Sequence, residues 1–293
     1  MFKMHGVVPP MVTPFDKEGN VDKEALKKLV RYLAKEVDGV FITGSYGSGA
    51  LMTLEERKEV AEIVIEEIAG EIDVIVMVGT TTNRESVELT KHAKKVGANA
   101  VAAVGPYYFS HNAQDVMNFY NDLITCEDIP VYLYNNPKFQ GYEIGLETIK
   151  KLKDMGLAGI KDATFDILTH ATYQRVLKDD HFDVALGTEA MFASARVLGC
   201  EAFIPGLANA FPEINRLMFK QGMDNDFEAM RDIQFKINRL RDVMYLAKST
   251  QLAIYAMLEI RGIVTCYPRK PFIQATQQEK EAIRKELGEL NML

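Results

Sequence analysis

The chain has 293 residues, of which 47 % are apolar and 26 % are charged, and its formal net charge is −7. This composition is typical of a globular protein with enough apolar material for a large core. A negative charge balance without any Lys/Arg-rich run argues against nucleic acid or an anionic membrane as the main partner.

Three further features favour a protein of the cytoplasm. The cysteines at 126, 200 and 266 are scattered and odd in number, which argues against a disulfide framework and favours a reducing compartment. Residues 1–6 lead into a proline-containing segment instead of a long apolar run, so we expect no signal peptide. No apolar stretch approaches the roughly 18 residues that a membrane span requires.

Short apolar runs alternate with helical patterns along the first part of the chain. The first run, 7–13, contains two prolines, which suit only a strand end or an irregular strand. Asp22 fits the N-cap of a helix whose apolar side chains recur every 3.6 residues. Capping-box patterns at 53–56 and 82–85 predict the starts of two more helices. The further strand-like runs are 38–43, 72–78, 99–104, 129–134, 157–160, 182–186 and 201–204.

These runs give eight strand–helix units, and most of the runs are apolar on both faces. Such runs imply a parallel sheet covered by helices. Eight units favour a closed (β/α)₈ barrel, the TIM barrel, over an open sheet, and no glycine fingerprint of a dinucleotide fold follows the first strand. We therefore predict an α/β protein with a barrel over 1–224 and a C-terminal helical extension, 225–293, packed on that barrel.

The extension has a purely helical pattern that ends with a helix over 277–290. Its apolar stripe most often signals packing within the chain, and a contact between subunits is the alternative. The stripe consists of Met230, Ile233, Ile237, Leu240 and Met244.

The carboxyl ends of the strands should meet at one rim of the barrel, where active sites of this fold lie. An amine, several tyrosines and two loops of small residues converge there. The rim segments are 44–49, 105–109, 134–137, 161–162, 187–189 and 205–206.

Lys161 is the candidate nucleophile, because it ends the apolar run 157–160. Desolvation at a barrel mouth destabilises an ammonium group, and the neutral amine can attack a ketone to form a Schiff base. The alternative is a lysine at a strand end that simply keeps its charge in water.

Other rim residues also have two interpretations. The glycine-rich loop lacks the ending of a nucleotide-binding loop; with Ser45 it could hold a small carboxylate, or it could be only a tight turn. Tyr134 could relay protons near a Schiff base or merely satisfy its own hydroxyl. By default, Asp162 and Glu189 would be solvated carboxylates. No His or Cys spacing predicts a catalytic metal.

Short motifs along nearly the whole chain carry a family resemblance. They are Val12-Thr13-Pro14-Phe15, Gly44-Ser45-x-Gly47, Pro106-Tyr107-Tyr108, Tyr134-Asn135-x-Pro137, Gly159-Ile160-Lys161-Asp162 and Arg269-Lys270-Pro271-Phe272. Each motif alone is weak, but the central four, in this order on a predicted barrel, are specific. The chain resembles the N-acetylneuraminate lyase / dihydrodipicolinate synthase family of pyruvate-dependent class I aldolases.

This resemblance implies a role for each matching residue. Lys161 would form the Schiff base with pyruvate or a related 2-oxo acid, without any cofactor or metal. Ser45 and the backbone N–H of Tyr46 would hold the substrate carboxylate, and Tyr134 would shuttle the proton. Family members are usually tetramers, in which Tyr108 would reach into a neighbouring site. The remaining substrate-binding positions would be Gly47, Phe139, Ala163, Gly187, Glu189, Ile204 and Gly206.

Several positions depart from the patterns of the resembling enzymes. Phe139 stands where the synthases have an arginine that clamps the carboxylate of the aldehyde substrate. Tyr46 replaces a small hydroxyl residue in the glycine-rich loop, and the loop lacks its usual glutamate. Of the lyases' acidic pair after strand 7 only Glu189 remains, and Ala163 replaces their threonine.

The loss of the arginine argues most directly against the synthase reaction. We therefore expect aldol cleavage of a 2-oxo-3-deoxy sugar acid or of a sialic acid. The alternatives are a dihydrodipicolinate synthase, which condenses pyruvate with aspartate semialdehyde, and a barrel that binds a 2-oxo acid as a sensor without turnover.

Overall fold

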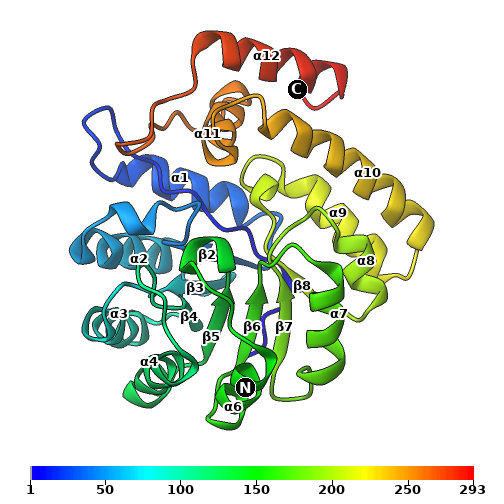
Figure 1. Cartoon of the computed structure of the whole chain (residues 1–293). Coiled ribbons are helices and arrows are strands. Elements are labelled where there is room, and N and C mark those ends of the chain that lie inside the picture. The colour runs from blue at the N-terminus through cyan, green and yellow to red at the C-terminus, as the bar shows by residue number, and fades with distance from the viewer. Residues whose placement is uncertain (1) are drawn as a thin grey trace.

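Eight parallel strands form the centre of the molecule (Figure 1). The computed structural model describes residues 2–293. Its strands are β1 (Gly6–Val7), β2 (Gly39–Ile42), β3 (Asp73–Met77), β4 (Ala100–Val104), β5 (Val131–Asn135), β6 (Gly159–Asp162), β7 (Asp183–Leu186) and β8 (Ala202–Phe203). They lie in the order β1-β8-β7-β6-β5-β4-β3-β2.

The sheet closes between its first and last members. Just beyond β1, Pro10 bridges Phe41 of β2 in parallel register. The N–H of Met11 donates to the Phe41 carbonyl at 3.0 Å, and the N–H of Phe41 donates to the Pro9 carbonyl at 2.9 Å. The predicted (β/α)₈ barrel is therefore confirmed.

Helices connect the strands and form an outer layer around them (Figure 1). In chain order these helices are α1 (Lys23–Leu33), η1 (Gly49–Leu51), α2 (Leu54–Ile68), α3 (Asn83–Val96), α4 (Ala113–Cys126), α5 (Pro137–Gln140), α6 (Leu146–Asp154), α7 (Ile167–Val176), α8 (Phe192–Val197), η2 (Gly206–Asn209) and α9 (Pro212–Met223). As expected, Asp22 and Thr53 cap α1 and α2 with their side-chain oxygens.

Successive residues of each strand point alternately into the barrel and out toward the helices. In β6, Ile160 belongs to the apolar layer beneath the helices, whereas Lys161 points inward. Phe41 of β2 and Tyr134 of β5 belong to the inner apolar cluster. Three side chains from non-adjacent parts of the chain are thereby brought together inside the barrel.

Strands β1 and β8 are shorter than the apolar runs 7–13 and 201–204, over which we predicted them. Pro9 and Pro10 follow β1 directly and have no N–H to donate to a ladder. Beyond β8, Pro205 similarly precedes the short helix η2. Both shortened strands leave irregular backbone at the rim.

The C-terminal extension consists of α10 (Phe227–Met244), α11 (Thr250–Ile260) and α12 (Gln277–Glu289). The predicted stripe on α10 packs within the chain, since α10 contacts α8, α9, α11 and α12. Met230, Ile237, Leu240 and Met244 are buried there, and Ile233 is half-buried. Intramolecular packing is thus confirmed for this face, while 225–293 as a separate unit stays a prediction.

No helix in the range 2–293 combines the length and the apolar character needed to cross a membrane.

Candidate active site

Lys161 lies inside the mouth of the barrel. Its register partner on β5 is Tyr134. The Lys161 Nζ atom lies 3.8 Å from the centre of the Tyr134 ring and 3.9 Å from the centre of the Phe41 ring. The residue is only 3 % exposed, so the interpretation as a solvated lysine is wrong.

Burial determines the charge of this amine. Desolvation lowers the pKa of Lys161 from its ordinary 10.5 to about 7. Within residues 2–293 no carboxylate forms an ion pair with Nζ that would favour the ammonium form. A large fraction of the amine is therefore neutral and nucleophilic near pH 7.

The Tyr134 phenol lies at the centre of a short chain of polar contacts. Its oxygen is 3.3 Å from the Ser45 hydroxyl oxygen, and Asn136 Nδ2 donates to it at 3.1 Å. Burial raises the pKa of Tyr134, which keeps the phenol protonated near neutral pH. A neutral phenol between a hydroxyl and an amide can pass a proton between a substrate and Ser45. Asn136 was not among the predicted site residues. It occupies the variable position x of the Tyr134-Asn135-x-Pro137 motif, so the motif gave no reason to select it.

The glycine-rich loop after β2 is held in shape from both sides. Gly47 is needed because a side chain there would lie 3.0 Å from the Met11 carbonyl oxygen. From α11, the Gln251 side-chain amide donates to the Tyr46 carbonyl at 2.7 Å and contacts the Ser48 hydroxyl at 2.6 Å. No local sequence signal could have identified Gln251, which lies about two hundred residues further along the chain.

The Tyr46 side chain extends from this loop toward β8. Its hydroxyl donates to Thr250 Oγ1 at 3.0 Å, and burial raises its pKa. A Cβ atom on Gly206 would lie only 2.6 Å from the Tyr46 phenol oxygen. The large residue at position 46 therefore favours glycine at position 206, since a larger residue there would displace the Tyr46 ring.

Glu189 follows β7 and is buried instead of solvated. Its Oε2 accepts from the Gly206 N–H at 2.9 Å, and its Oε1 is 2.5 Å from Arg241 Nη1 of α10. Gln234 donates to its carbonyl at 2.8 Å. A substrate hydroxyl would have to compete with Arg241 and the Gly206 amide for this carboxylate.

The structure separates the remaining predicted positions into buried and exposed ones. Ala163 and Ile204 belong to the inner apolar cluster, and the Gly187 N–H donates to the Asp162 carbonyl at 2.6 Å. Phe139 on α5 is 51 % exposed. Tyr108 is 85 % exposed in the single chain, so it is not part of the Tyr134 contacts there.

No cluster of three or more His, Cys, Asp or Glu side chains suited to a metal ion occurs among residues 2–293. The amine of Lys161, the phenol of Tyr134 and the hydroxyl of Ser45 are the reactive groups that meet at this site. This set can form, hold and reprotonate an imine of a small keto acid.

Comparison with known proteins identifies the class and then the family. A barrel with a buried amine at its mouth has the architecture of a class I aldolase. The family model of the dihydrodipicolinate synthetase family matches residues 3–290. The chain belongs to this family, and it is a pyruvate-dependent class I aldolase, a lyase. Family members use a covalent Schiff base with pyruvate and no metal. Membership argues against the non-catalytic sensor.

Individual relatives differ in the reactions for which they are named. A 4-hydroxy-tetrahydrodipicolinate synthase of Methanopyrus kandleri is 28 % identical over 100 % of this chain and 98 % of its own. A probable 2-dehydro-3-deoxy-D-pentonate aldolase of Escherichia coli is 27 % identical over 97 % of this chain and 96 % of its own. A solved prophage protein of the dihydrodipicolinic acid synthase family from E. coli, in complex with pyruvate, has the same fold, with a TM-score of 0.95 and 24 % identity over 99 % of both chains.

Proposed function

We propose that this enzyme cleaves a 2-oxo-3-deoxy sugar acid or a sialic acid into pyruvate and an aldehyde, through a Schiff base on Lys161. The observation that carries the proposal is the buried amine between the Phe41 and Tyr134 rings, which has no carboxylate partner among residues 2–293. An amine held in this way is a nucleophile near neutral pH.

The reaction balances with the groups at the site. The neutral amine adds to the C2 ketone, and the carbinolamine hydroxyl takes up a proton and leaves as water, which gives a protonated imine. The C3–C4 bond breaks, its electron pair forms an enamine, and the C4 hydroxyl loses its proton as the aldehyde leaves. The enamine takes a proton at C3, and water then hydrolyses the protonated imine to pyruvate, the free amine and a proton. Tyr134, in contact with Ser45, carries the proton from the C4 hydroxyl.

The glycine-rich loop provides donors for the substrate carboxylate. The Ser45 hydroxyl and the backbone N–H of Tyr46 are the donors that we assign to it. Gln251 holds the carbonyl side of Tyr46, so the loop is preorganised before the substrate arrives.

Phe139 supports a sugar-acid substrate. Its exposed ring stands at the position where the synthases carry an arginine, and it offers no charge to an aldehyde that bears a carboxylate. The E. coli pentonate aldolase among the relatives is consistent with a sugar acid. The synthase reaction is the second candidate, because the Methanopyrus relative carries that name.

Two exposed apolar surfaces support a homotetramer. Tyr108 and Phe109 are 85 % and 67 % exposed and stack edge to face at 5.0 Å. Separately, Leu168 of α7 and Leu198 beside α8 line a surface hollow of about 440 Å³. Two different self-complementary surfaces are what a dimer of dimers needs.

The cysteines of the described chain are free thiols, which fits an enzyme that acts in the reducing cytoplasm.

Light scattering of the native protein tests the assembly. We expect a tetramer, and Leu168→Lys should reduce it to a dimer. Leu217→Lys is the matched control, since Leu217 is an exposed leucine of α9 on another face. A monomeric wild-type enzyme would contradict the assembly.

The chemical proposal is tested by reducing the enzyme with borohydride in the presence of pyruvate and mapping the adduct by peptide mass spectrometry. The adduct should lie on Lys161 and should be absent from a Lys161→Ala variant. A panel of 2-oxo-3-deoxy sugar acids and sialic acids is then assayed for pyruvate release, and aspartate semialdehyde is tested with pyruvate for condensation. An unmodified Lys161 peptide would contradict the mechanism, and activity confined to aspartate semialdehyde would establish the second candidate.

A further inference from the structure

One side of the barrel mouth is bridged by the side chain of Tyr46. This residue lies in the loop after β2, and its ring reaches the chain that follows β8. Strand β1 lies between β2 and β8 in the closed barrel, so the ring spans the end of one strand. A Cβ atom on Gly206 would lie 2.6 Å from the Tyr46 phenol oxygen, 2.7 Å from Cζ and 3.0 Å from Cε1. The outer end of the ring therefore rests on Gly206.

Both ends of this bridge are fixed by hydrogen bonds. Thr250 Oγ1, at the start of α11, accepts from the Tyr46 hydroxyl at 3.0 Å, and Gln251 donates to the Tyr46 carbonyl at 2.7 Å. On the other side, Asn209 of η2 is fully buried. Its Nδ2 donates to the Gly206 carbonyl at 3.0 Å and to a carbonyl of the chain beyond β1 at 3.1 Å. The wall made by Tyr46 and Gly206 is therefore tied to the barrel and to the C-terminal helices.

The carboxylate that follows β7 adjoins this wall and is bound by the protein itself. Glu189 is 1 % exposed. Its Oε2 accepts from the Gly206 N–H at 2.9 Å, and its Oε1 lies 2.5 Å from Arg241 Nη1 of α10. A substrate hydroxyl that replaced one of these partners would leave a buried polar group without its hydrogen bond, which is costly. Glu189 therefore closes this side of the mouth as part of the wall.

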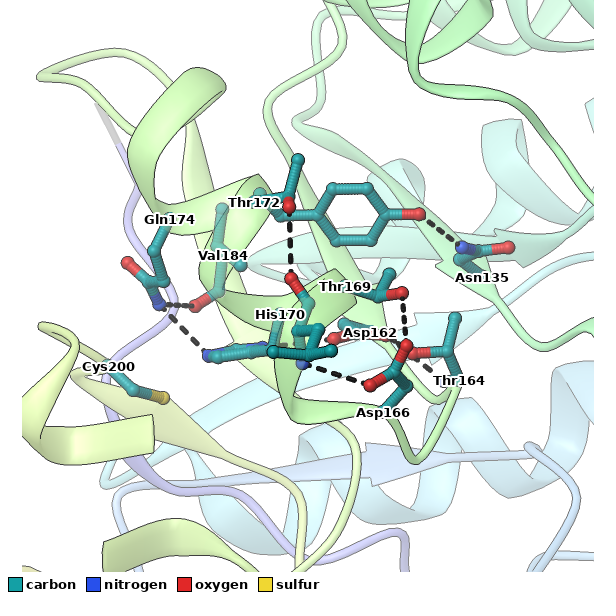
Figure 2. Close-up of polar contacts among 12 residues, drawn as sticks. Asn135, Asp162, Thr164, Asp166, Thr169, His170, Thr172, Gln174, Val184 and Cys200 are labelled. Carbon is teal, nitrogen blue, oxygen red and sulfur yellow. Dashed lines mark hydrogen bonds and ion pairs between the residues drawn. The ribbon is translucent and has the colours of Figure 1, made fainter. Parts of the chain in front are cut away.

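The carboxylate at the end of β6 is turned away from the mouth. Figure 2 shows Asp162 on the outer side of the strand, beside His170 of α7 and Thr164. One carboxylate oxygen accepts from the Thr164 N–H at 3.0 Å and from its hydroxyl at 2.7 Å, and the other lies 3.0 Å from His170 Nδ1. The carboxylates at the ends of β6 and β7 are thus both engaged within the protein, which disfavours a long polyhydroxylated substrate on this side.

The position of Lys161 determines how much of a substrate meets the wall. On the β5 side of the amine, the Tyr134 ring centre lies 3.8 Å from Nζ, so we expect the carbons beyond C4 to extend toward β7 and β8. Neighbouring strands lie about 4.8 Å apart, which puts β8 roughly 10 Å from β6. The Tyr46 ring takes up part of this distance, because it covers Gly206 at the end of β8.

We propose that Tyr46 determines the substrate length and restricts the enzyme to 2-oxo-3-deoxy acids of five or six carbons. These acids release an aldehyde of two or three carbons, which fits between Lys161 and the wall. A nine-carbon sialic acid is excluded, because its aldehyde half is a six-carbon amino sugar that meets the Tyr46 ring. The inference rests on the proposed cleavage at Lys161 and narrows its substrate class.

The test compares kcat/KM for pyruvate release from 2-oxo-3-deoxy acids of five, six and nine carbons, the last being N-acetylneuraminate. In the wild type, we expect the value for N-acetylneuraminate to be at least about 10²-fold below that of the best short acid, since one methylene group in a tight pocket already changes kcat/KM by about 10–200-fold. Tyr46→Thr should bring the two values to within about tenfold of each other. The ratio is the readout, because a weaker hold on the shared carboxylate would affect all three acids alike.

Tyr46→Phe is the matched control, since it keeps the ring and loses only the hydrogen bond to Thr250. Its preference should remain that of the wild type. Efficient cleavage of N-acetylneuraminate by the wild type, or an unchanged preference in a folded Tyr46→Thr enzyme, overturns the inference.

If Tyr46→Thr does not fold, Tyr46→Leu removes the outer part of the ring and must shift the preference in the same direction. A folded Tyr46→Leu enzyme with the wild-type preference would equally overturn the inference. The proposed function is tested separately. Without a borohydride adduct of pyruvate on Lys161 in the wild type, the aldol cleavage itself is contradicted, whatever the substrate length.

Discussion

The two faces of strand β6 place ionisable side chains in different surroundings. On the inner face, the amine of Lys161 is buried against aromatic rings and has no ionic partner in the part of the chain that the structure describes. On the outer face, the neighbouring Asp162 is equally buried but is paired with His170. A buried charge that only supports the fold is paired, because an isolated one is costly. We therefore assign the proposed chemistry to the amine of Lys161.

The largest expected effect comes from removing the unpaired group. Lys161→Ala should reduce pyruvate release by about 10⁴-fold or more, since a covalent pathway loses its nucleophile. Circular dichroism should show an intact fold, because the substitution removes a buried amine and no ion pair. Substantial turnover by this variant would contradict the assignment of the inner face.

Tyr134→Phe should have the next largest effect. Loss of the phenol should lower kcat by roughly 10²–10⁴-fold with a smaller change in KM, because proton transfer is lost while the carboxylate contacts remain. Ser45→Ala is the comparison variant, and it should raise KM as well as lower kcat. Steady-state kinetics with the preferred 2-oxo acid provides both values.

The outer pair should be visible in the pH dependence of stability. The pKa of His170 is higher in the folded chain, about 9, than its ordinary 6.5. Its contribution is therefore fully present below pH 6.5 and is lost as the pH rises through 9. The lowered pKa of Lys161 acts in the opposite sense, with stability lost as the pH falls from 10.5 toward 7.

The difference between wild type and His170→Asn isolates the histidine. In urea unfolding, the wild-type advantage should shrink by about 2–3 kcal/mol between pH 6 and pH 10. A constant difference across this range would show that the pair is not ionised.

The smallest expected effect concerns the rim. Gly206→Ala should destabilise the fold by about 1–2 kcal/mol, because the new methyl group meets the Tyr46 phenol. Combining it with Tyr46→Thr should recover most of this loss, since the smaller side chain leaves the space open. Thermal unfolding of the single and double variants measures the coupling, and simple additivity would contradict the close contact.

The barrel and the position of the candidate nucleophile were predictable because they depend on local patterns. Alternating apolar runs and helix caps such as Asp22 and Thr53 are short-range signals. An amine at the end of an apolar run is equally local, but this signal alone left a solvated lysine as the alternative; the ordered family motifs favoured the buried position that the structure shows for Lys161.

The surroundings of that amine were not predictable in the same way. Phe41 meets Lys161 only because the sheet closes into a barrel, which brings β2 and β6 to face each other. Glu189 meets Arg241, and Tyr46 meets Gln251, through contacts between residues 52 and 205 positions apart. The expectation of solvated carboxylates at 162 and 189 was wrong because the partners that bury them come from other helices.

The central claim is that Lys161 is buried without an ionic partner among the residues that the structure describes. NMR of enzyme labelled at the lysine ε-position follows every amine through a pH titration. One resonance should titrate near pH 7 and should disappear in Lys161→Met. If no lysine resonance titrates near pH 7, the account is contradicted.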